Sequence, residues 1–371
     1  MILGGAQENT LLTCEGLHAR GHDVTLATGP ALGPEGELLT RARGGGYNVI
    51  EVAQMRRQIN PIRDHRAYRR LVKLLKELRP DIMHSHSSKA GILARKAAAE
   101  VGGIKIVHTV HGLPYHRYLS PRRNGLYIVL EKLAARRSDA IVSVADAMTR
   151  KALAAGVGRP EQYATIYSGM ETGAYLDAAG AQEFRDSLGL ERDTLLVTQV
   201  SRLAELKGHQ YILDAAERIA DPRVRFCFVG DGRRRDRIQA ETDRRGLADR
   251  FIFTGLIAPD RIGAVMSGSD IVVHCSLREG LARALPQAML AARPVISFDI
   301  DGAREVVDDS TGVLLAPGDV DGLTSAIEKL AADPELRANL GAAGRERCRE
   351  AFSHNLMVDR IEELYLKLTG S

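Results

Sequence analysis

A carboxylate and a side-chain amide flank the expected start of a helix within residues 277–294. Glu279 stands before this start, and Gln287 follows eight residues later. Pro286 lacks an N–H group and fits a helix only in its first turn, so we predict that the helix begins near residues 282–283. The backbone N–H groups at this end would be free to bind an anion. They belong to Leu281, Ala282 and Arg283.

The spacing of these groups fits a ligand that carries a diphosphate between two sugars. Eight helical residues extend roughly 12 Å, and a nucleotide diphosphate separates its ribose from a sugar on the far phosphate by a similar length. We therefore predict that Glu279 binds sugar hydroxyls, that the free N–H groups bind phosphates and that Gln287 binds the ribose.

Two cations follow another expected strand and could bind the same diphosphate. Arg202 comes just after the apolar run 195–200, and Lys207 follows five residues later. Ligands of parallel sheets lie at the carboxyl ends of the strands, where these two charges could neutralise a diphosphate leaving group. A surface pair beside a helix start is the alternative. Gly230, in the glycine turn 230–232, is expected near the nucleotide base.

The first half of the chain offers glycines and histidines at comparable places. Gly4 and Gly5 are expected at a strand-to-helix turn, where the backbone can approach a phosphate closely. The histidines at the ends of two neighbouring expected strands are His84, His86, His108 and His111. They could hydrogen-bond hydroxyls or shuttle protons, and contacts with backbone groups are the alternative, above all for His108. No acidic or thiol partner has the spacing of a zinc site, so we predict no metal.

These groups need elements to position them, and the apolar pattern alternates between strands and helices. The expected strands are 23–27, 48–52, 82–84, 105–110, 140–144, 163–167, 195–200, 225–229, 250–254, 271–274, 294–297 and 312–314. The expected helices include 66–78, 89–101, 123–137, 209–219 and 323–331. This pattern predicts an α/β protein of two doubly wound, Rossmann-like domains, residues 1–172 and 173–350. A last helix within 351–371 could cross back to the first domain. Only residues 1–3 precede Gly4, so the first strand of the N-terminal domain would be largely missing.

Composition and charge narrow the class of protein. The chain has 371 residues, too many for one core, of which 44% are hydrophobic and 26% charged. No run approaches the ~18 apolar residues of a membrane span, the start is no signal peptide, and the four cysteines lack ligand spacing. We therefore expect a cytoplasmic protein.

The charge is unevenly distributed. Residues 1–175 carry 25 Lys and Arg against 15 Asp and Glu, whereas the whole chain has a net charge of only +4. This basic half could contact an anionic membrane or a lipid-phosphate acceptor, and a solvated helix face is the alternative. Nucleic acid is not expected, because aromatic residues make up 5% of the chain and none is interleaved with the basic runs.

Four motifs in this order resemble glycosyltransferase family 4, namely GGAQ at 4–7, His111-Gly112, VSRLAELKG at 200–208 and EGLARALPQAM at 279–289. Members of this family are retaining, metal-independent enzymes that use nucleotide-sugar donors. Their GT-B fold has two Rossmann-like domains facing each other across a cleft. The resemblance implies that Arg202 and Lys207 bind the donor diphosphate, with Gly5 facing the same phosphates. It also implies that Glu279 binds the donor sugar and that His111 lies close to it.

The chain departs from the family pattern at two places. Gln287 replaces a glutamate, the usual ribose ligand, which should weaken donor binding by on the order of 1 kcal/mol because charge assistance is lost. Ala282 replaces a small glycine and should still permit contact between the amides and phosphate, which Arg283 could supplement.

The resemblance implies a hexosyltransferase-type enzyme without a cofactor. It would move a sugar from a UDP or GDP sugar to a carbohydrate or lipid-linked acceptor in bacterial-type cell-surface polysaccharide or glycolipid synthesis. Peripheral contact with the inner face of the membrane is a further option. The alternatives are another GT-B enzyme, such as a nucleotide-sugar epimerase or a phosphorylase, and a non-catalytic sugar-nucleotide-binding protein, which Gln287 and the short N-terminus favour. Motifs of dinucleotide oxidoreductases, P-loop NTPases and α/β-hydrolases are missing.

Overall fold

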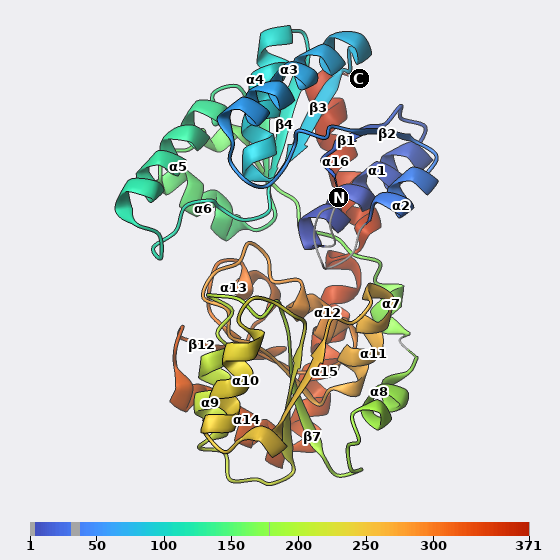
Figure 1. Cartoon of the computed structure of the whole chain (residues 1–371). Helices are drawn as coiled ribbons and strands as arrows, with labels where there is room; N and C mark the ends of the chain where they lie inside the picture. Colours follow the sequence, from blue (N-terminus) through green and yellow to red (C-terminus); the bar gives the residue numbers. More distant parts are fainter. Residues whose placement is uncertain (1–3, 31–37, 178, 371) are drawn as a thin grey trace. The chain divides into compact units, whose positions relative to one another are not determined.

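The computed structural model describes residues 4–30, 38–177 and 179–370, which form two compact units (Figure 1). The first unit combines the chain up to Met170 with the segment from His354 onward, and the second unit spans Glu171–Ser353. The strand expected at residues 1–3 lies outside the described residues. Each of the twelve other expected strands is present, with ends shifted by at most two residues.

The described part of the first unit holds two parallel sheets, one of β1 and β2 and one with the strand order β3-β4-β5-β6. Its strands are β1 Thr25–Thr28, β2 Asn48–Glu51, β3 Ile82–His86, β4 Lys105–Val110, β5 Ala140–Ser143 and β6 Tyr163–Thr165. Its helices are α1 Gly5–Ala19, α2 Leu39–Gly44, α3 Pro61–Leu78, α4 Ser88–Val101, α5 Pro121–Ala135, α6 Asp146–Ala154, the 3₁₀ turn η1 Pro160–Gln162 and α16 His354–Thr369.

The larger sheet of the first unit is covered on both faces, as successive residues of β4 show. Ile106 packs with α3 and α4, whereas Val107 packs with α1 and α16. Successive side chains of a strand point to opposite faces, so one short apolar strand serves two layers of helices. The histidines at the ends of β3 and β4 are therefore held by a packed sheet.

The C-terminal helix α16 belongs to the first unit and lies along α1 (Figure 1). A Cβ on Gly16 would come within 2.6 Å of the Val358 side chain, so glycine permits the close approach of the two helices. Arg20 also forms an ion pair of 2.6 Å with Glu362. No helix in the described part of the chain is both long and apolar enough to span a bilayer.

The second unit is one parallel sheet of six strands with the order β12-β11-β10-β7-β8-β9. Its strands are β7 Leu195–Val200, β8 Val224–Val229, β9 Phe251–Gly255, β10 Ile271–His274, β11 Val295–Phe298 and β12 Gly312–Leu315. Its helices are α7 Gly173–Leu176, α8 Ala181–Ser187, α9 His209–Ala216, α10 Arg235–Arg244, α11 Ile262–Gly268, α12 Ala284–Leu290, α13 Ala303–Val306, α14 Val320–Ala332 and α15 Pro334–Ala351, with 3₁₀ turns η2 Ala248–Arg250 and η3 Pro259–Arg261.

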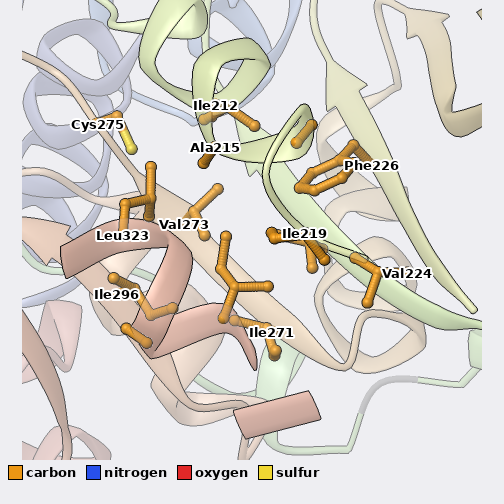
Figure 2. Close-up of a cluster of buried hydrophobic side chains, with 14 of the residues drawn as sticks. Ile212, Ala215, Ile219, Val224, Phe226, Ile271, Val273, Cys275, Ile296 and Leu323 are labelled. Carbon is orange, nitrogen blue, oxygen red and sulfur yellow. The ribbon is translucent and has the colours of Figure 1, made fainter. Parts of the chain in front are cut away.

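The core of the second unit anchors the strands that lead to the candidate site. Ile271, Val273 and Cys275 enter the cluster that α9 and α14 cover, with Ile212 and Leu323 as neighbours (Figure 2). The opposite face of the sheet packs against α8 and α11. Because strand residues alternate, His274 is on the other face from its neighbours Val273 and Cys275.

Candidate functional site

The polar residues of the second unit gather where the strand order reverses. β7 lies beside both β8 and β10, so the connections after β7 and β10 leave the sheet edge in opposite directions. A crevice at such a switch point, outside the carboxyl ends of the strands, is the usual ligand site of an open parallel sheet. Lys207 follows β7, and Glu279 follows β10. The structure brings these two predicted site residues together.

The loop that carries Lys207 has an unusual backbone. Leu206 and Gly208, on either side, both take left-handed φ values, of 64° and 74°. A Cβ at position 208 would lie 1.8 Å from the carbonyl oxygen of Cys275, so only glycine fits there. A left-handed residue other than glycine costs roughly 1–2 kcal/mol, and such strain is concentrated at functional sites.

Gln199 connects the loop after β7 to the loop after β10 through two hydrogen bonds. Its side chain is buried, its Nε2 donates to the Lys207 carbonyl oxygen at 3.1 Å, and its Oε1 accepts from the Cys275 N–H at 3.2 Å. The Leu277 N–H also donates to the Leu206 carbonyl oxygen at 2.8 Å. The backbone under Lys207 and the segment that leads to Glu279 therefore form one hydrogen-bonded body.

Glu279 is held by three neighbours. Its Oε1 forms an ion pair with the Lys207 ammonium and lies 3.3 Å from Nε2 of His274, while its backbone N–H donates to Oδ2 of Asp301 at 2.6 Å. Burial alone would raise the pKa of the Glu279 carboxyl, but the Lys207 charge and the His274 hydrogen bond outweigh it and lower the pKa well below its usual range. The group is a carboxylate at neutral pH.

Asp301 has an unusual backbone conformation. Its φ is 49°, a left-handed value that Asp tolerates better than most side chains because it can hydrogen-bond locally. Here the carboxylate accepts the Glu279 N–H. This contact gives a physical reason for an aspartate at a position that favours glycine.

The helix after Glu279 begins at Ala284, with Arg283 as its N-cap, one residue beyond the predicted start. Leu281 and Ala282 are buried. The Gln287 side chain donates from Nε2 to the hydroxyl of Tyr175 at 2.7 Å, a contact with α7 that the sequence does not reveal.

Arg202 and Gly230 are two further predicted site residues of this unit. Arg202 is exposed and takes part in no hydrogen bond or ion pair among the described residues. Gly230 has a φ of 132°, and a Cβ there would lie 2.2 Å from the Ser201 carbonyl oxygen, so this glycine lets two loops pack closely.

The first unit joins the histidines predicted at its strand ends. Nδ1 of His86 lies 3.0 Å from Nε2 of His111, so one ring donates an N–H hydrogen bond to the other. Burial lowers the pKa of His86 to about 4, and the ring is neutral at physiological pH. His84 contacts Thr109 at 2.7 Å and Tyr365 of α16 at 2.5 Å, while His108 contacts the Ser85 hydroxyl at 3.0 Å. His108 is therefore satisfied by a side chain rather than only by the backbone.

Gly4 and Gly5 lie at the start of α1, Gly4 as its N-cap in an extended conformation and Gly5 as its first residue. This agrees with the helix side of the predicted turn. Among the residues that the structure describes, no group of three or more His, Cys, Asp or Glu side chains is arranged to hold a metal ion.

Sequence reasoning missed His274, Gln199 and Tyr175. The only signal for His274 is that it is a polar residue at the end of an otherwise apolar strand, and Gln199 is a polar residue inside one. Polar residues in a buried strand need a hydrogen-bond partner. Their position in an apolar strand therefore indicates a contact with another polar group.

Two family models and several known proteins match this chain. Residues 180–347 match the family model of the glycosyl transferases group 1, and residues 4–169 match that of the glycosyl transferase 4-like domain. A 2-deoxystreptamine glucosyltransferase of Streptomyces kanamyceticus is 30% identical over 76% of this chain and 76% of its own length. The UDP-Gal:alpha-D-GlcNAc-diphosphoundecaprenol alpha-1,3-galactosyltransferase of Escherichia coli is 28% identical over 99% of this chain and 95% of its own length.

Solved structures share the fold. The Anabaena protein HepE, crystallised in complex with UDP, has a TM-score of 0.83 at 21% identity, over 98% of this chain and 96% of that one. The architecture is thus the two-domain α/β GT-B fold.

Proposed function

The chain belongs to the group 1 glycosyl transferases, and on this premise we propose that it transfers the sugar of a UDP sugar with retention of configuration and without a metal ion. The observation that carries the proposal is the Lys207–Glu279 pair at the switch point of the second sheet. A carboxylate and an ammonium side by side can bind the two parts of one nucleotide sugar. Glu279 would bind the sugar hydroxyls, and Lys207 would bind the diphosphate.

The proposed chemistry is a displacement at the anomeric carbon. The bond from this carbon to the diphosphate oxygen breaks, and a bond to the acceptor hydroxyl oxygen forms on the same face of the sugar. Lys207 and Arg202 stabilise the departing diphosphate electrostatically. The leaving phosphate oxygen takes the hydroxyl proton, so no protein base is required.

The remaining predicted residues have supporting roles in this proposal. Gln287 binds the ribose, Gly230 lies near the base, and the N–H groups at 281–283 contact the diphosphate. In the first unit, Gly4 and Gly5 take phosphate contacts through the backbone, and His111 acts beside the transferred sugar, with its ring oriented by His86 at 3.0 Å.

We further propose a lipid-linked carbohydrate acceptor. The name of the E. coli relative gives a UDP sugar as donor and a diphosphoundecaprenol sugar as acceptor. The same chemistry fits a chain whose first half is basic, because Lys and Arg attract lipid phosphates. Synthesis of a cell-surface polysaccharide or glycolipid at a membrane would follow.

The transfer assay tests the proposal. The protein is incubated with UDP sugars and a lipid-linked acceptor, and NMR reports the anomeric configuration of the product. We expect UDP release, a retained configuration and no effect of a chelator. Lys207→Ala and Arg202→Ala should each lower the rate about 100-fold or more. Near-normal rates in both variants would refute the assigned site.

Arg218→Ala is the matched control, since Arg218 is a half-exposed cation of the same unit whose partner is Asp321. A protein that binds UDP sugars but forms neither product nor free sugar would instead be the non-catalytic binding protein.

A further inference from the structure

His274 lies directly behind the Glu279 carboxylate and has no role in the function proposed above. Its side chain is only 4% exposed, and its Nε2 is 3.3 Å from Oε1 of Glu279. A carboxylate can only accept hydrogen bonds, so Nε2 carries the proton and donates it. His274 is the last residue of β10, on the central part of a packed sheet, and its place is therefore fixed.

The His274 ring makes this one polar contact and no other among the described residues. Its Nδ1 is buried without a hydrogen-bond partner. A buried polar atom without a partner destabilises the folded state, so a histidine placed only for packing would be a poor choice at this position. An apolar side chain would fill the space without that cost.

Lys207 and His274 converge on the same oxygen of Glu279. In the proposed function Lys207 turns to the diphosphate when the donor binds, which removes the ammonium from this oxygen. His274 is on a strand and stays. The carboxylate then keeps one donor on Oε1 while its other oxygen meets the sugar hydroxyls.

We propose that His274 is a positioning residue that holds the Glu279 carboxylate in its sugar-binding orientation after the Lys207 ammonium has moved from Glu279 to the donor diphosphate. This inference rests on the proposed function of Lys207 and Glu279.

The charges around Glu279 explain why a second donor is needed. Four groups face or adjoin its carboxylate, namely Lys207 after β7, His274 at the end of β10, the neighbouring Arg278, and Asp301 after β11, whose own carboxylate accepts the Glu279 N–H. Burial raises the pKa of Glu279, and the Lys207 charge and the His274 hydrogen bond lower it. Once Lys207 is engaged elsewhere, His274 is the remaining side-chain hydrogen bond that favours the charged form.

Substitution of His274 tests the inference through donor kinetics and their pH dependence. His274→Phe keeps a ring and removes the donor, and His274→Gln places an amide N–H where Nε2 lies. We expect His274→Phe to lower kcat/KM for the UDP sugar about 10- to 100-fold and to move the acid limb of the pH profile to higher pH. His274→Gln should restore most of the rate and the wild-type limb.

Ser297→Ala is the matched control, because Ser297 is buried beside His274 on β11 and its hydroxyl donates to the His274 backbone carbonyl oxygen rather than to the ring. Wild-type kinetics and an unmoved acid limb in His274→Phe, or a His274→Gln variant as slow as His274→Phe, would overturn the inference. If His274→Phe does not fold, His274→Asn, whose amide stops short of Glu279, replaces it. Glu279→Gln distinguishes a failure of the inference about His274 from a failure of the proposed function. Full transfer by that variant would refute the proposed function itself.

Discussion

Lys207 and Glu279 neutralise each other in the structure, and in the proposed function each binds one half of a nucleotide sugar. Removing one partner of such a pair leaves an uncompensated charge at a largely buried place, which is costly. A diphosphate and a set of sugar hydroxyls that arrive together replace both partners at once. The pair therefore favours a ligand that carries both groups, and inorganic phosphate alone would be a poorer substitute.

Gln287 allows a gain-of-affinity prediction at the scale of one residue. Its Nε2 is engaged with the Tyr175 hydroxyl at 2.7 Å. In Gln287→Glu the hydroxyl would donate to a carboxylate instead, and the ribose hydroxyls would gain a charged acceptor. We expect the Kd for UDP to fall about fivefold, or roughly 1 kcal/mol, as measured by titration calorimetry.

Gln287→Met is the control for this prediction, because it keeps the length of the side chain and removes its polar atoms. It should weaken UDP binding. Equal affinities in the wild type and both variants would remove Gln287 from the donor site.

At the scale of elements, the strand ends that carry the site follow from short apolar runs. Lys105–Val110, Leu195–Val200 and Ile271–His274 begin and end where the apolar pattern predicts. The helix α3 begins five residues earlier than expected, because Asn60 caps it through a 3.0 Å bond from the Arg63 N–H and Pro61 fits its first turn. Caps of this kind are local signals, and the apolar pattern alone does not reveal them.

The loop between β7 and α9 yields a prediction about stability. Gly208→Ala would place a Cβ against the Cys275 carbonyl oxygen in addition to the strain of a left-handed φ. We expect a loss of about 3 kcal/mol in the free energy of unfolding, from about 1–2 kcal/mol of backbone strain and a similar amount of overpacking. Urea unfolding measures this loss, and the donor affinity should fall with it.

Gly189→Ala is the matched control for Gly208→Ala. Gly189 has a left-handed φ of 65°, but a Cβ there meets nothing within 4 Å. It should show the strain alone, about 1–2 kcal/mol. Equal losses in the two variants would mean that the contact between the loops is not what requires glycine at position 208.

At the scale of the whole molecule, the excess of basic residues in the first half of the chain predicts contact with an anionic membrane surface. Near the start of α3, Ile59 is 75% and Ile62 70% exposed, and Arg56, Arg57 and Arg66 are exposed along the same segment. Exposed apolar side chains among arginines are typical of surfaces that bind anionic membranes.

We expect the protein to sediment with vesicles of anionic phospholipid and to be released by salt, since screening weakens surface attraction. Arg56→Ala combined with Arg57→Ala should reduce the bound fraction several-fold, at about 1 kcal/mol for each cation near the surface. Arg218→Ala, in the second unit, should not. Binding that is equal for neutral and anionic vesicles would contradict an electrostatic contact.

The sequence predicted the two-unit α/β architecture because alternating strands and helices repeat along the whole chain. It placed Lys207 and Glu279 in one site through their positions after strands. It did not predict the contacts of Glu279 with His274 and Asp301, or that of Gln287 with Tyr175, because these depend on side-chain directions at loops from separate parts of the chain. Arg202, which the sequence paired with Lys207, is exposed in the structure.

Titration of UDP into the protein tests the central claim most directly, which is that Lys207 binds the donor diphosphate. The wild type and Arg218→Ala should bind one UDP with equal affinity, and Lys207→Ala should bind at least about 10-fold more weakly. The double variant with Lys207→Ala and Glu279→Gln removes the uncompensated carboxylate and should remain weak. Affinity in the double variant equal to that of the wild type would contradict the account.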